Sequence, residues 1–430
     1  MSALPQSSAP NANQDDALRQ RILAARERSL TWLLSLQQPG APTGVTRISA
    51  AHEAGPWPGM LLPGTYNAVM ARELLGDIAP MMTPQREALA DWLLQHRLAD
   101  GRFRIPGMTD DTVHKKPQLA DTWQYIDFHV SNYSLGAVQA LCPQRPARLD
   151  FVLPWLDPLH LKAWLSERDL RDPWQEGNNI VNLGSFLLCL AAQDHVARER
   201  VREAMTIMFA WHERLQEPAT GFWGVGQRSN ATALLHAMAG SMHNFHLWYA
   251  AGRALPFQDR AVDYALSRPP EIHSACIDVD LVDLLVHGHR ALDHRRADTE
   301  RWLHALLAQL LDFQQPDGGF ADEPARAGAS PRRQDGWVGG YTEPQGLSNT
   351  FATWFRWIAI AMASGCLWPQ WQAFAGGWQF RRMVGIGYAN LQPHNPAIRP
   401  WARTPSTHFT ICTTRATSTA TTRRALVQTA

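Results

Sequence analysis

The chain has little net charge, few cysteines and no long uncharged apolar run, and each shortage excludes a class of protein. A formal charge of +1 over 430 residues provides neither the basic surface of a nucleic-acid binder nor an acidic surface for a cationic partner. The longest weakly charged runs, 178–192 and 357–370, are shorter than the roughly 20 apolar residues of a membrane span. We therefore expect no nucleic-acid partner, no integral membrane span, and a small partner held in a cavity.

Cysteine usage and the first residues bear on the compartment. The five cysteines are odd in number and lie scattered, mostly within apolar helical patterns, which predicts buried free thiols and a reducing environment. The first 17 residues lack the basic start and apolar core of a secretory signal. These features predict a cytoplasmic protein.

Alternating β-branched runs are almost absent, whereas apolar residues recur at helical spacing through most of the chain, which favours an all-α fold. Two kinds of helix alternate. Helices with one charged face are expected at about 17–36, 85–98, 157–167, 197–214, 258–267 and 299–313. Helices that are apolar on all sides, and hence buried, are expected to start near residues 60, 127, 177, 241, 277 and 347.

This alternation predicts an (α/α)6 toroid of six outer and six inner helices around a central cavity. The toroid is expected to cover residues 17–378, after a disordered N-terminus over 1–16. Residues 379–430, rich in Thr and Arg towards the end and without a repeating apolar face, are predicted to be an irregular, disordered tail.

Polar residues cluster where the inner helices are expected to begin. They are Asn67, His129, Asn132, Asn178, Asn179, Asn182, His243, Asn244, His246, Asp278, Asp280 and Asn349. One interpretation is that they are N-caps, which satisfy the free N–H groups of a helix start. The other is that they line the mouth of the cavity, where convergent helix N-termini would favour an anionic group.

Aromatic residues suggest which side chains meet a substrate. Most of the eighteen tryptophans are expected to be core residues, but some aromatic side chains lie in or beside segments that lead into inner helices. The predicted substrate-binding residues are Trp123, Tyr125, His129, Tyr133, Trp174, Glu176, Asn178, Asn179, Trp223, His243, His246 and Asn349.

A repeated helix-then-turn ending carries a resemblance to a known family. The segment from His273 reads HSACIDVDLVDLLVHGHRAL, and the helix after it closes on QQPDGGF at Gln314. Weaker copies of that turn are LQQPG, LADGRF and LQEPATGFW. The pattern resembles the terpenoid cyclase and protein prenyltransferase superfamily, and most closely the squalene-cyclase type of class II cyclase.

The resemblance implies a catalytic acid. Class II cyclases protonate an alkene or epoxide with the central Asp of an Asp-x-Asp-Asp-Thr motif, and a like charge nearby keeps that carboxyl neutral. Asp278 and Asp280 match the first two acids, and Leu281 and Val282 stand where the family has Asp and Thr. Asp283 lies three residues beyond Asp280, on the same helix face. Asp280 is therefore the expected proton donor on an isoprenoid or similar hydrophobic substrate, with Asp278 and Asp283 as further catalytic residues.

No metal site is specified, although a divalent metal is left open. The prenyltransferase branch uses zinc held by Asp, Cys and His, and Cys276 with Asp278 has a Cys-x-Asp spacing to which His129, His243 or His246 would add a ligand.

Two other functions fit the same architecture. Many glycan hydrolases, lyases and epimerases are (α/α)6 toroids, and here Asp127, Glu176, His129 or Tyr133 would supply acid and base. The third possibility is a non-catalytic toroid that binds a lipid or protein partner, which the incomplete Asp motif favours.

Overall fold

The fold is all-α, as the sequence predicts. The computed structural model describes residues 12–113, 119, 121–168, 170, 172–226, 230–325, 328 and 341–379. Across these ranges there is no β-strand, only isolated antiparallel bridges such as Gln37–Thr46 and Ala321–Ser348. The same residues contain no helix long and apolar enough to cross a membrane.

Helices of two kinds alternate along the chain. The first kind comprises α1 (Ala12–Ser35), α3 (Thr83–Leu94), α5 (Pro158–Ser166), α7 (Arg198–Leu215), α9 (Gln258–Ser267) and α11 (Arg296–Asp312). The second comprises α2 (Leu61–Leu74), α4 (Thr122–Leu141), α6 (Pro173–Gln193), α8 (Ala231–Ala250), α10 (Ala275–Ala291) and α12 (Thr350–Leu367). Two short 3-10 helices, η1 (Pro58–Met60) and η2 (Asp150–Leu156), precede α2 and α5.

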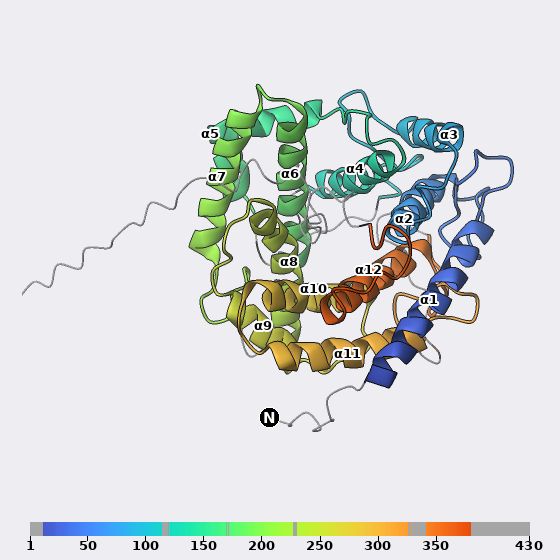
Figure 1. The fold of residues 1–430 in the computed structure, drawn as a ribbon. Helices are drawn as coiled ribbons and strands as arrows, with labels where there is room; N and C mark the ends of the chain where they lie inside the picture. Colours follow the sequence, from blue (N-terminus) through green and yellow to red (C-terminus); the bar gives the residue numbers. More distant parts are fainter. Residues whose placement is uncertain are drawn as a thin grey trace, which may run out of the picture.

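Helices of the second kind form a closed cycle of contacts. Helix α2 packs on α4, α4 on α6, α6 on α8, α8 on α10, α10 on α12, and α12 returns to α2. Figure 1 shows these helices around a common centre, with those of the first kind outside them. The burial pattern agrees, because all but a few residues of α2, α10 and α12 are buried, whereas α1 buries only one side.

Five of the six inner helices begin at capping residues, of which only Asn349 was among the predicted polar residues. The side chains of Asp121, Asp172, Asn230, Ser274 and Asn349 accept hydrogen bonds from backbone N–H groups of the first turns of α4, α6, α8, α10 and α12. Helices α4, α6 and α8 therefore start at residues 122, 173 and 231 rather than near 127, 177 and 241.

This shift corrects the interpretation of the polar cluster. Among the polar residues predicted at the inner-helix starts, only Asn349 is an N-cap, and residues such as His129, Asn182 and His246 lie well inside their helices. A helix dipole acts mainly on the first turn. The expected attraction of an anion by helix ends near His243 and His246 therefore loses its basis.

The outer helices lie close to their predicted ranges. Helix α9 matches its prediction at both ends, and α1 begins at Ala12 rather than at 17, so part of the segment predicted to be disordered is helical. The predicted tail falls, apart from Gln379, outside the described residues.

Candidate active site

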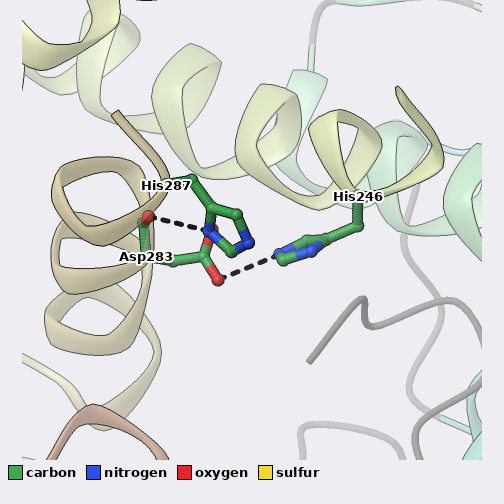
Figure 2. Close-up of side chains that lie close together, drawn as sticks. All are labelled: His246, Asp283 and His287. Carbon is green, nitrogen blue, oxygen red and sulfur yellow. Dashed lines mark hydrogen bonds and ion pairs between the residues drawn. The ribbon is translucent and has the colours of Figure 1, made fainter. Parts of the chain in front are cut away.

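One face of α10 carries a row of buried ionisable side chains. Asp280, Asp283 and His287 are spaced three and four residues apart, so they lie on the same side of the helix. The side chains of Asp280 and Asp283 are fully buried and that of His287 nearly so. Helix α8, which packs against α10, brings His246 to this row (Figure 2).

Asp283 is held between two imidazoles. Its Oδ2 lies 3.1 Å from Nε2 of His246, and its Oδ1 lies 3.1 Å from Nδ1 of His287. Burial by itself raises the pKa of this carboxyl, but the charges and hydrogen bonds of His246 and His287 outweigh it and hold the pKa well below its usual range. Asp283 is therefore a carboxylate at neutral pH.

Asp280, one turn earlier, has the opposite environment. Neither of its carboxyl oxygens has a hydrogen-bond partner among the described residues. Burial first, and then the negative charges of Asp283 and Asp278, raise the pKa of Asp280 well above its usual value. Two carboxyl groups on one helix face thus have pKa values shifted in opposite directions, as in sites that pair an acid with a charged neighbour.

Asp278 belongs to a different group of contacts. It forms a buried ion pair with Arg356 of α12, and both of its oxygens accept hydrogen bonds from the backbone N–H of His273 at 3.1 Å. Its hydrogen bond to the His273 side chain raises the pKa of that imidazole despite partial burial. The structure thus places Asp278 as the residue that anchors the start of α10, and the catalytic role predicted for it receives no support from these contacts.

Further histidines extend the cluster towards α4 and α6. Burial lowers the pKa of His243 to about 3, with smaller contributions from His246 and His129, so His243 is neutral at pH 7. His129 Nδ1 lies 3.0 Å from the carbonyl oxygen of Tyr125 and 3.4 Å from Nδ2 of Asn182. Asn132 in turn donates to Oδ1 of Asn182 at 2.7 Å. Side chains of α4 and α6 thus form one polar group, and His243 on α8 is near enough to His129 and His246 for their charges to affect its pKa.

Aromatic rings border this network. Tyr133 packs edge-on against Trp354 of α12, with 5.3 Å between ring centroids, and also contacts Tyr66 and His129. Tyr133 and His243 are partly accessible, whereas Trp354 and Tyr66 are buried. Of the predicted binding residues, His129 is in ring contact with both Tyr125 and Tyr133, whereas His246 pairs with Asp283.

Several other predicted binding residues have contacts elsewhere. Trp223 is buried beside α7, where its indole N–H donates to the carbonyl oxygen of His212 at 2.7 Å, and its predicted place at a cavity mouth stays a prediction. Asn349 caps α12. Trp123 donates to Asp110 beneath the guanidinium of Arg104, and Trp174 packs on His236.

The remaining predicted residues, on α6, surround a buried ion pair. Glu176 lies 3.3 Å from the guanidinium of Arg168 and accepts from Asn179 at 3.2 Å, while Asn178 is half-buried. Asp127 is contacted by both Arg102 and Arg104. Asp127 and Glu176, the two carboxylates among the four acid and base candidates for a glycan-active enzyme, are thus both paired with arginine.

Sequence reasoning missed His287 and Arg356. His287 follows Asp283 by four residues, and this Asp-x-x-x-His spacing was a usable signal for a shared helix face. Arg356 lies on α12, far along the chain, and no local pattern links it to Asp278. Within the described ranges, Cys276 and Asp278, considered for zinc, are not part of a cluster whose ligand atoms are close enough to hold a metal ion, whereas the ligand atoms of His246, Asp283 and His287 are close enough.

Comparisons with known proteins do not assign this site. No protein-family model and no curated protein matches the chain. The chemistry of the site must therefore be argued from its own residues.

Proposed function

We propose that this chain is an enzyme in which Asp280 protonates an isoprenoid or similar alkene-bearing hydrophobic substrate, in the manner of a class II terpenoid cyclase. The single observation that carries the proposal is the state of Asp280, a fully buried carboxyl that has no hydrogen-bond partner among the described residues. A structural acid in such a place would be expected to have partners, because an unsatisfied buried polar group destabilises the fold.

The pKa of Asp280 suits proton donation. Burial and the neighbouring carboxylates raise this pKa well above its usual value, so the group holds its proton to higher pH than an ordinary carboxyl does. His246 and His287 keep Asp283 ionised beside it, and this maintains the negative charge that disfavours ionisation of Asp280. In the proposed step a C–H bond forms at an alkene carbon, the O–H bond of Asp280 breaks, and a carbocation is left beside a carboxylate.

A group of aromatic rings on α2, α4 and α12 would suit a cationic intermediate. Tyr133, Trp354 and Tyr66 pack together next to His129, and aromatic faces attract a cation within about 6 Å by roughly 0.5–2 kcal/mol each. The carbocation would then lose a proton to water to give a new alkene, and a proton returned from solvent would restore the acid form of Asp280.

The proposal also includes a specific arrangement of the helices. We infer that the closed cycle of α2, α4, α6, α8, α10 and α12, with alternate helices outside it, is the (α/α)6 toroid expected from the sequence. In this arrangement the substrate would lie at the centre, enclosed by the six inner helices.

Glycan binding is a second candidate, favoured by a different cleft. Aromatic and polar side chains line an open cleft of about 460 Å3 beside α5, including Trp155, His160, Trp164, Gln124 and Asp121. Stacking rings beside hydrogen-bonding groups are typical of sugar sites. This cleft lies apart from the α10 row.

Solvent deuterium tests the acid. The full chain is incubated in D2O with a linear polyprene, its terminal epoxide and isoprenoid diphosphates, and with oligosaccharides in parallel. We expect an isoprenoid product that carries one solvent deuterium at the protonated carbon, and its loss in Asp280→Asn. Asp293→Asn, at a side chain that is 99% exposed after α10, is the matched control. Turnover of an oligosaccharide would support the second candidate instead, and binding of a lipid without turnover would support a non-catalytic protein.

A further inference from the structure

Three buried side chains from two helices converge around one point. His246 of α8 faces Asp283 and His287 of α10, and a ring nitrogen from each histidine and a carboxylate oxygen of Asp283 all lie within 4.8 Å of one another (Figure 2). We infer that His246, Asp283 and His287 bind a divalent transition-metal cation such as zinc. This inference goes beyond the proposed acid catalysis and does not depend on it.

The helices pre-position these ligands. Asp283 and His287 are four residues apart and project from the same face of α10, and His246 is carried by α8, which packs directly on α10. Both residues of α10 and His246 are buried. A metal that binds to a site built on two packed helices causes little loss of conformational entropy, because the side chains are already confined.

The donor set indicates the class of metal. Two imidazole nitrogens and one carboxylate oxygen suit zinc, cobalt, nickel and ferrous iron, whereas magnesium and calcium prefer oxygen ligands. Metal–ligand bonds of about 2.0–2.2 Å place tetrahedral ligand atoms roughly 3.4 Å apart. The three ligand atoms already lie within 4.8 Å of one another, so only a small rotation of the side chains is needed to bring them to this spacing.

Contacts behind the ligands fix the orientation of His287. Its Nδ1 lies 3.1 Å from the carbonyl oxygen of Asp283, and donation to that oxygen leaves the second ring nitrogen as an acceptor on the side of His246 (Figure 2). The ring of Tyr249 stacks on the His287 ring at a centroid distance of 4.1 Å and an angle of 6°. A histidine held by a backbone carbonyl behind it is the usual arrangement around a protein-bound metal.

The cation would also act on Asp280. A dication at Asp283 favours the ionised form of a nearby carboxyl, so proton donation by Asp280 would belong to the metal-free chain. Metal binding and alkene protonation are therefore separate properties, which are measured by separate experiments.

The test needs no substrate. Full-length chain without an affinity tag is stripped with a chelator, dialysed, and titrated with Zn2+ by calorimetry and with Co2+ by visible absorption. We expect one high-affinity site per chain, cobalt d–d bands, and a zinc-dependent rise in melting temperature, because a ligand that binds only the folded state stabilises it.

Conservative variants assign the ligands. Asp283→Asn, His246→Gln and His287→Gln should each weaken zinc binding at least about 100-fold, beyond the effect usual for a residue outside the ligand set. His289→Gln is the matched control, since His289 is on the same helix but pairs with Glu300 at 2.9 Å, and its affinity should be unchanged.

Two results would overturn the inference. One is the absence of a saturable site in the folded wild-type chain, and the other is cobalt bands that persist in Asp283→Asn. Near-ultraviolet circular dichroism identifies any variant that fails to fold, and the remaining variants then decide the assignment. Loss of activity in Asp280→Asn with zinc affinity retained separates the metal site from the proposed acid.

Discussion

Asp278 and Arg356 form a fully buried ion pair that joins the start of α10 to α12. The guanidinium of Arg356 also donates to the carbonyl oxygens of Asp322 at 2.6 Å and His273 at 3.2 Å. These contacts bring together the N-terminal end of α10, the turn after α11 and the middle of α12. The position of the whole Asp280–His287 face therefore depends on a residue far along the chain.

Replacement of Arg356 by Met should destabilise the fold strongly. The substitution leaves Asp278 buried without its charge partner, and removal of one member of a buried pair costs about 3–5 kcal/mol. Urea denaturation measures the free energy of unfolding. Arg295→Met, at a partly exposed arginine, is the control and should cost no more than about 1 kcal/mol. Equal losses of unfolding free energy in the two variants would show that the buried pair contributes no more to stability than an exposed one.

Asp280→Asn should change how stability depends on pH. The folded state raises the pKa of Asp280, so above the ordinary value of about 3.9 the folded chain holds a proton that the unfolded chain has released. The stability that this proton provides is lost as pH rises through that window, by up to about 1.4 kcal/mol per pH unit. The amide of the variant does not titrate, so the stability of Asp280→Asn should rise relative to that of wild type as pH increases.

Denaturation at a series of pH values between 5 and 8 provides the measurement for Asp280. The Asp293→Asn variant should follow the wild-type curve, because Asp293 is exposed. Parallel curves for Asp280→Asn and wild type would mean that Asp280 titrates normally.

His212→Gln should make the fold more resistant to acid. Burial lowers the pKa of His212 to about 3, so between about 6.5 and 3 the unfolded state binds a proton that the folded state does not. Stability falls as pH falls through that window, by up to about 1.4 kcal/mol per pH unit. We expect the melting temperature of the variant to fall less steeply than that of wild type between pH 7 and pH 4. His289→Gln, at a histidine paired with Glu300, is the control. If the melting temperature of His212→Gln fell with pH as steeply as that of wild type, the burial argument would be contradicted.

The helices and the shared face of Asp280 and Asp283 were predictable because both follow from spacing along the chain. Apolar periodicity predicted α9 at its exact bounds, and a separation of three residues placed the two acids together. Helix starts were less predictable, since Asn230 caps α8 ahead of a stretch that was not assigned to any helix. The opposite states of Asp280 and Asp283 could not be derived, because the histidine that holds Asp283 across the helix interface comes from α8.

Periodicity, capping residues and apolar content are local properties, and they determine that this chain is helical, alternates two kinds of helix and carries acids on one face of α10. Tertiary packing decided what each acid does. A pKa depends on the charges, donors and solvent within a few ångströms, and some of these are supplied by residues distant in the chain. Packing gave Asp278 an arginine and Asp283 a second imidazole, from His246, and it buried Asp280 without a hydrogen-bond partner among the described residues, so three similar residues became an anchor, a carboxylate and a buried acid.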